Sequence, residues 1–301
     1  MQVMQNMSNS NVTLAQLQVF LSVVDQSSFT LAAEALGMTQ SGVSQAIATL
    51  EALLKGALFV RDRQGISLTH LGEKILPHAR AALQHIDCLE QEATAISGLM
   101  TGQLRIGSIV SIATVLLPPL LKVFSRKYPD VRLSLLEGAD PEIDEWLLSG
   151  LIDIGFCVFS HPNLESHRIA VDEMLVVVPE HHLLTAYKAI TPRQLAREPF
   201  LMPVAGCEPL IQSFFSKAGV IPQVRLEIRE MTTLISLVKE GLGVSIMPQL
   251  LLTPLPDGIK TIRLKPNVQR QIMLVLNPGQ PQNAATKAFI QELKPELGNG
   301  S

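Results

Sequence analysis

Three shortages in this sequence each exclude a class of protein. The cysteines, Cys88, Cys157 and Cys207, are odd in number and widely spaced, which fits a reducing compartment and excludes a disulfide framework or a cysteine-based zinc site. The first eleven residues contain no Lys or Arg and no apolar core, so we expect a frayed tail rather than a signal peptide. The longest apolar runs, such as IVSIATVLLPPLL, are broken by Ser and Pro. They are too short to span a bilayer, so we expect a cytoplasmic protein without a membrane partner.

Charge and catalytic motifs are also sparse. Charged residues make up 17% and hydrophobic residues 47% of the 301 positions, as in a globular chain, and the net charge of −3 gives no sign of a nucleic-acid partner. G-x-S-x-G, P-loop, H-E-x-x-H and G-x-G-x-x-G motifs are all absent. The histidines do not have metal-ligand spacing. We therefore expect no enzyme, no metal and no cofactor.

Two regions of different character are present. Residues 12–69 are rich in Ala, Ser, Thr and Gln and are typical of short helices, whereas strand-like and helical runs alternate from Gln103 onward. The runs LRIGSIV, VRLSLLE and DIGFCVF, separated by helical runs at 112–127 and 140–149, predict parallel strands covered by helices. Similar alternation from 167 to 247, a strand QRQIMLVLN and a last helix from about 282 predict two α/β lobes.

A heptad pattern joins the two regions. Its apolar positions are spaced 4, 3, 4, 3, 4 and 3 residues apart, at Ile75, Ala79, Ala82, Ile86, Leu89, Ala93 and Ile96. This period favours a dimerising coiled coil, the alternative being an amphipathic helix that lies on its own domain. Pro77 lies inside the run and should kink the helix or shift its start.

Residues 30–51, TLAAEALGMTQSGVSQAIATLE, resemble two helices around a turn. Thr30 and Thr39 are candidate N-caps, and Gly37 supplies the positive φ of the turn. In the second helix an apolar stripe faces inward, and the opposite side carries Gln40, Ser41, Ser44 and Gln45. This is the pattern of a helix-turn-helix whose second helix enters the major groove, where Gln and Ser bind base edges and phosphates. The alternative is a solvated face on an ordinary helix pair.

The next segment predicts a wing. ALFVRDRQGISLT contains two strand-like runs around Gln-Gly, with Arg61 and Arg63 beside the turn. Residues 12–72 nevertheless carry three basic and four acidic residues, a formal balance of −1, where DNA-binding modules usually show a basic footprint. We therefore expect weak non-specific affinity and a shallow salt dependence.

These motifs together resemble the LysR-type transcriptional regulators. The resemblance rests on Leu17, Phe20, the run SSFTLAAEALGMTQSGVSQAIATLE, then ALFVR and LTHLG at 68–72, in the order typical of that family. The chain departs from the family pattern at Lys55, where Gly is usual, and at Gln64, where Arg is usual. Arg63 can substitute for the latter in part.

The resemblance implies an α+α/β organisation in three parts. These are a winged helix-turn-helix at 12–69, a linker and dimerisation helix at 70–99, and a two-lobed, periplasmic-binding-protein-like effector domain at 102–301. Lobe I would take about 102–162 and 266–296, and lobe II about 163–265. Its implied partners are double-stranded DNA, a second copy of the chain in a dimer or tetramer, a small-molecule effector and RNA polymerase. The DNA-binding candidates are Thr30, Thr39, Gln40, Ser41, Ser44, Gln45, Arg61 and Arg63.

Effector candidates follow from where α/β lobes bind ligands. The carboxyl end of strand LRIGS and the following helix N-terminus place Ser108 and Ser111 as an anion seat, and the loop MPVAG at 202–206 would face it. The candidates are Ser108, Val110, Ser111, Ile112, Phe156, Met202, Val204 and Thr232. They predict a small carboxylate with an apolar body.

Three other interpretations are open. Cys157 and Cys207 could form a redox sensor across the cleft, although buried apolar packing is the usual role of such cysteines. The chain could be a cytosolic solute-binding protein that binds no DNA, but it shows no signal peptide. An enzyme on two α/β lobes would need a catalytic constellation that the sequence does not display.

Overall fold

The structure is a computed structural model that describes residues 12–62, 65–96, 100–204 and 206–297. Two compact units divide the chain. The first comprises residues up to Gly102 together with 148–151 and 278–285, and the second comprises the remainder. The expected N-terminal tail lies outside the described residues. Each unit is taken by itself below.

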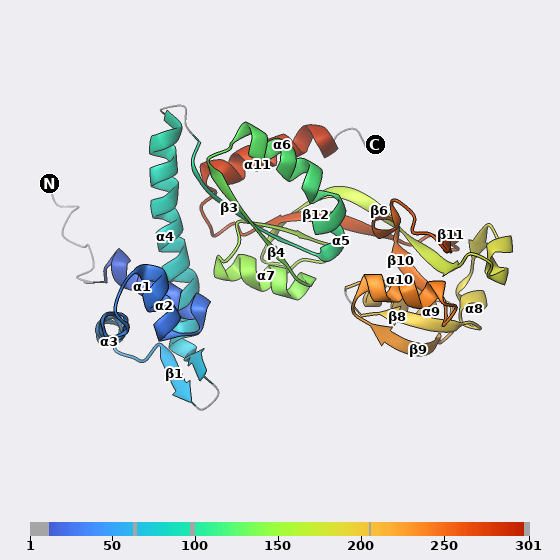
Figure 1. Ribbon diagram of the computed structural model, residues 1–301, viewed down its shortest axis with the longest axis horizontal. Helices are drawn as coiled ribbons and strands as arrows, with labels where there is room; N and C mark the ends of the chain where they lie inside the picture. The colour runs from blue at the N-terminus through green and yellow to red at the C-terminus, as the bar shows by residue number, and fades with distance from the viewer. Residues whose placement is uncertain (1–11, 63–64, 97–99, 205, 298–301) are drawn as a thin grey trace. The chain divides into compact units, whose positions relative to one another are not determined.

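Three helices open the first unit: α1 (Leu14–Gln26), α2 (Phe29–Leu36) and α3 (Gln40–Leu54) (Figure 1). Thr13 caps α1 in a capping box with Gln16. The prediction for α3 is confirmed, because Thr39 accepts the Gly42 N–H as its N-cap. The prediction for α2 is wrong: Ser28, not Thr30, is its N-cap, since the helix begins at Phe29. Thr30 is therefore an exposed residue of the first helical turn.

Left-handed residues end α2 and α3. Gly37 caps α2 at φ 64, as predicted, and Lys55 caps α3 at φ 56. Lys55 occupies the position where the resemblance expects Gly. A residue with a Cβ is strained in this region by roughly 1–2 kcal/mol. The inward stripe of α3 is confirmed, because Val43, Ile47 and Leu50 are buried in the core of this unit.

The predicted wing is present as a two-stranded antiparallel sheet. Strands β1 (Phe59–Asp62) and β2 (Gly65–Leu68) pair from Phe59 opposite Leu68 to Asp62 opposite Gly65. The Phe59 ring lies 5.5 Å from that of Phe20 and 5.7 Å from that of Phe29. The wing is thus anchored on the helical core by aromatic packing.

Helix α4 (His70–Ile96) carries the heptad pattern, and its two halves differ. Ile75 and Ala79 pack into the helix-turn-helix core, whereas Leu89 is 64% exposed. Pro77 does not shift the start of the helix, which begins seven residues earlier. The first part of the seam therefore belongs to its own domain, whereas Leu89 and Ala93 of the later part are exposed.

A second face of α4 is polar and buried. Arg80 donates to Asp25 on α1 at 2.6 Å and to Ser149 at 3.2 Å, and Gln84 donates to the Gly150 carbonyl at 3.2 Å. These bonds attach residues 148–151 to the linker helix. That short segment therefore belongs to the first unit.

The second unit is built on a mixed sheet of eight strands. Its order is β4 (Val131–Glu137), β3 (Gly102–Ser108), β5 (Ile154–Cys157), β12 (Gln269–Leu276), β6 (Glu165–Pro179), β11 (Ile259–Leu264) and β7 (Ala189–Ile190), with β10 (Ser245–Pro248) also paired to β6. Strands β3 and β5 are parallel, as predicted, but β12 runs antiparallel to both β5 and β6. The prediction of parallel strands concerned the runs at 104–110, 131–137 and 153–159. Strands β6 and β12 lie outside these runs, extend through the middle of the sheet and link its two ends.

We call the β3, β4 and β5 end lobe I. Helices α6 (Leu117–Lys127) and α11 (Ala284–Leu297) lie on one side of these strands, with α5 (Val110–Val115) preceding α6, and α7 (Asp140–Ser149) lies on the other side (Figure 1). The ring of Phe124 on α6 packs edge-on against Phe289 on α11 at 5.2 Å. Lys127 and Glu292 pair at the surface of the same two helices.

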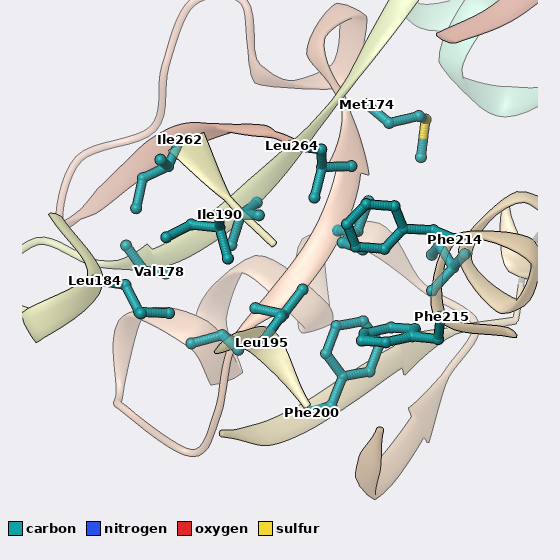
Figure 2. Packing of buried hydrophobic residues seen from close by; sticks show 14 of the residues in the cluster. Met174, Val178, Leu184, Ile190, Leu195, Phe200, Phe214, Phe215, Ile262 and Leu264 are labelled. Carbon is teal, nitrogen blue, oxygen red and sulfur yellow. The ribbon is translucent and has the colours of Figure 1, made fainter. Parts of the chain in front are cut away.

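We call the opposite end lobe II. It adds the parallel pair β8 (Pro199–Pro203) and β9 (Gln223–Ile228) and the helices α8 (Pro192–Leu195), α9 (Glu208–Ser216) and α10 (Met231–Lys239), with short 3-10 turns at Leu183–Ala186 and Gln249–Leu252. Its core contains Phe200, Phe214 and Phe215, packed below Leu264 and Ile190 (Figure 2). Phe215 meets Phe200 edge-on at 5.3 Å.

Candidate functional site

The outer face of α3 carries uncharged polar side chains. Gln40, Ser41 and Gln45 are exposed and Ser44 is half-buried. Gln40 Nε2 donates to Ser44 Oγ at 3.3 Å, and the hydroxyls of Ser41 and Thr39 lie 3.1 Å apart. The four side chains thus lie together on one surface of a capped helix, as the sequence predicted. Each keeps hydrogen-bonding capacity for an outside partner.

The other DNA-binding candidates are spread over neighbouring elements. Thr30 is exposed on α2. Arg61 lies on β1, opposite Ile66 of β2. Arg63 lies outside the described residues. Thr39 has a structural role as the α3 cap and is exposed as well.

A cavity of about 340 Å³ lies between the two lobes of the second unit. Residues from α5, the start of α7, the loop after β8, the start of α10 and strand β12 line it. Its apolar lining includes Ile109, Val110, Val158, Val204, Leu210, Met231, Pro248 and Leu251. Its volume is at the small end of the ~300–1,000 Å³ typical of ligand pockets.

Arg270 is the central polar residue of this cavity. Its side chain is almost fully buried and bonds to Asp172 Oδ2 through Nε at 2.9 Å and Nη2 at 2.8 Å. Nη2 also donates to Ser111 Oγ at 2.9 Å, and Nη1 lies 3.9 Å from Cys207 Sγ. One guanidinium on β12 therefore contacts lobe I through Ser111 and lobe II through Cys207.

Acidic side chains from lobe I lie beside the same cavity. Asp140 Oδ1 accepts the Val158 N–H at 2.9 Å, and burial raises the pKa of its carboxyl. Burial also raises the pKa of Asp144, which lies one turn further along α7 and is not among the lining residues. Glu142 Oε2 accepts the Ala139 N–H at 2.8 Å. The Asp140–Val158 bond thus attaches the start of α7 to the segment that follows β5.

The predicted effector residues separate into three groups. Val110, Ser111 and Val204 line the cavity. Ser108, Ile112, Phe156 and Met202 do not line it, and all four are buried. Phe156 lies in the middle of β5, so its side chain packs within lobe I, and Met202 belongs to the lobe II core. Thr232 is an exposed residue of α10, next to the lining residue Met231.

The sequence prediction missed Arg270 and Asp172. Both are charged residues inside apolar strand runs, QRQIMLVLN and HRIAVDEMLVVV. A buried charge in a central strand requires a charged partner. That rule would have suggested the pair, although not its position at the cavity.

The positions of Cys157 and Cys207 give little support to a redox sensor. Cys157 and Cys207 are both free and buried, and only Cys207 is among the residues that line the cavity. Burial raises the pKa of both thiols, which disfavours the reactive thiolate. Within the described part of the chain, no group of His, Cys, Asp and Glu could hold a metal ion, and no helix is long and apolar enough to cross a membrane.

Comparison with known proteins identifies the family. Residues 14–73 match the model of the bacterial regulatory helix-turn-helix of the lysR family, and residues 97–298 match the LysR substrate binding domain. The chain belongs to the LysR family of transcriptional regulators. The uncharacterized regulator YvbU of Bacillus subtilis (strain 168) is 35% identical over 290 residues, covering 95% of this chain and 99% of that protein.

Solved LysR-family regulators share the fold over the whole length. A full-length OxyR variant from Pseudomonas aeruginosa superposes with a TM-score of 0.78 at 22% identity, covering 96% of each chain. Full-length CbnR in complex with its target DNA gives 0.65 at 24% identity, covering 94% of this chain and 99% of that one. The winged helix-turn-helix and the α/β domain of this regulator are thus those of the family.

Proposed function

We propose that this regulator binds specific duplex DNA through α3 and responds to a small molecule held between lobes I and II. The observation that carries the first half is the exposed row of Gln40, Ser41, Ser44 and Gln45 on a capped helix. Gln can bond bidentately to adenine, and Ser can bond a base edge or phosphate. CbnR, a fold relative, is known in complex with its target DNA, which supports the same use of the head here. Contacts to the DNA backbone would come from Thr30, Thr39, Arg61 and Arg63.

The proposed assembly is a dimer or tetramer in the cytoplasm. The later part of α4 offers Leu89, which is 64% exposed, as a surface for a second copy. Two heads held together would double weak single contacts and bend the DNA between sites, at a cost of about 1–6 kcal/mol. A ligand that favours one arrangement of the lobes would change how often the bent DNA complex forms, and with it the contact with RNA polymerase. In this proposal residues 12–69, 70–99 and 102–301 act as head, linker and sensor.

The effector cavity is the second half of the proposal. Ser111, Val110 and Val204 line it, and Arg270 supplies a buried cation that the sequence analysis did not include. Arg270 joins both lobes through Ser111 and Cys207. A ligand that engages this side chain would therefore act on the relation between the lobes.

A gel shift on the intergenic DNA beside the protein's own gene tests the assignment. Ser44→Glu places a carboxylate on the proposed DNA face and should abolish the shift. Ser108→Ala alters a buried hydroxyl of lobe I and should leave the shift in the absence of ligand unchanged. Equal retention of binding by both variants would contradict the role of α3.

A further inference from the structure

The charges around the cavity between lobes I and II are unequal. Two guanidiniums, Arg229 and Arg270, stand against four carboxylates, a formal balance of −2: Glu137, Asp140, Glu142 and Glu230. Arg270 is in addition already paired with Asp172 at 2.8 Å. A ligand with two negative charges would enter a site whose buried cation is neutralised and whose walls are acidic. The carboxylate ligand expected from the sequence therefore needs a compensating positive group.

The cavity floor still offers donors for an oxygen. Arg270 Nη1 has only the sulfur of Cys207, at 3.9 Å, as a neighbouring acceptor among the described residues. Ser111 uses its oxygen to accept from Arg270 Nη2, which leaves its hydroxyl proton to donate. Both side chains are more than nine-tenths buried, at 3% and 5% exposure. Buried donors without an oxygen acceptor favour a ligand that supplies one.

Exposed carboxylates lie on both lobes beside the same cavity. Glu137 ends β4 of lobe I, and Glu230 precedes α10 of lobe II, where its side chain makes no cap bond. Neither carboxylate has a hydrogen-bond or ion-pair partner in the described part of the chain. Both carboxylates are therefore open to a cationic group of a ligand that occupies the cavity.

From these two observations we propose that the effector is an amino carboxylate, a zwitterion with an ammonium group and an oxygen acceptor. Its carboxylate binds Arg270 Nη1 and the Ser111 hydroxyl, and its ammonium group lies toward Glu137 and Glu230. Such a ligand leaves the net charge of the cavity unchanged, satisfies the buried donors and gives the two exposed carboxylates a cationic partner. This inference rests on the proposed effector role of the cavity and specifies the chemistry of its ligand.

Calorimetric titration of the full-length protein with matched five-carbon probes tests whether the ligand is an amino carboxylate. The probes are norvaline, 5-aminopentanoate, pentanoate, pentylamine and glutarate, and shorter and longer amino carboxylates extend the set. We expect an amino carboxylate to bind at least about tenfold more tightly than the carboxylate, amine and dicarboxylate of its own length. Glutarate or pentanoate binding as tightly would overturn the proposal. So would the absence of binding by every amino carboxylate at about 10 mM.

Isosteric variants locate the ammonium group. Glu137→Gln and Glu230→Gln each remove one exposed negative charge and should lower the advantage of the amino carboxylate over the plain carboxylate severalfold. Glu240→Gln, at the other end of α10 and outside the cavity lining, is the matched control and should keep the full advantage. An unchanged advantage in both test variants overturns the proposal. A gel shift on the same preparations separates this failure from failure of the DNA-binding role.

Discussion

The polar face of α3 and the polar residues at the cavity both offer hydrogen-bonding side chains, but the first are exposed to water and the second are buried. On α3, Gln45 and Ser41 are exposed, and water satisfies them until a partner arrives. At the cavity, Arg270 is buried and forms an ion pair with the buried Asp172 behind it, so the two charges must satisfy each other. Exposed polar groups can be exchanged at little cost to stability, whereas a buried charge cannot lose its partner cheaply. The exposed face of α3 is therefore tolerant of substitution in folding, and the buried Arg270–Asp172 pair is not.

Arg270→Met should give the largest effect and tests the buried side of this contrast. Removing the guanidinium leaves Asp172 buried without its cation, at a cost of about 3–5 kcal/mol in the free energy of unfolding. Urea unfolding followed by circular dichroism measures the loss. Arg263→Met, at an exposed position on β11 of the same sheet, is the control and should lose little. Similar losses in the two variants would show that the buried pair has no special weight.

Gln45→Glu tests the exposed side. The change is isosteric, but it replaces an amide donor with a carboxylate facing DNA, so affinity should fall about 10–100-fold for each base that no longer receives its hydrogen bonds. Unfolding should be unaffected. Fluorescence anisotropy with labelled operator DNA measures the affinity. Gln18→Glu, exposed on α1, carries the same charge change and should bind nearly as the wild type. A fall of equal size in both variants would indicate general charge repulsion instead of a specific contact.

Leu89→Lys tests whether the exposed part of α4 holds two heads together. A charge at this position should weaken self-association about tenfold or more, because the apolar seam would bury it. Sedimentation at several concentrations detects the change. Leu183→Lys is the control and should leave self-association unchanged. It alters an apolar side chain outside α4 that is even more exposed, at 87%. Dimerisation that survives the first variant as well as the second would place the interface elsewhere.

Lys55→Gly should give the smallest effect. The left-handed φ of 56 at the end of α3 strains a lysine but not a glycine, so the variant should be more stable by about 0.5–1 kcal/mol. The midpoint of thermal unfolding reports the gain. Gln26→Gly, at the helical end of α1, should instead destabilise. A loss of stability at residue 55 would mean that the lysine side chain makes a contribution larger than the strain.

The head was predictable from sequence because its signals are local. The Thr39 cap, the Gly37 turn and the Val43–Leu50 stripe depend on residues a few positions apart. Only the N-cap of α2 was assigned to the wrong residue, Thr30 instead of Ser28. The cavity depends on contacts over long separations, as between Ser111 and Arg270, 159 residues apart. Neither periodicity nor spacing encodes such a contact. Phe156 was expected to line the cavity as a strand end and Met202 as part of the loop at 202–206, but both pack in the cores of the lobes.

We infer that uncharged contacts, and not a basic surface, give the helix-turn-helix its affinity for DNA. The salt dependence of DNA binding tests this most directly. Residues 12–72 carry a formal charge of −1, so few phosphates are neutralised per subunit. The slope of log K against log salt for the dimer should therefore be well below about 10 in magnitude. A slope as steep as about −10 would contradict the account, because it would require a basic footprint that this sequence does not contain.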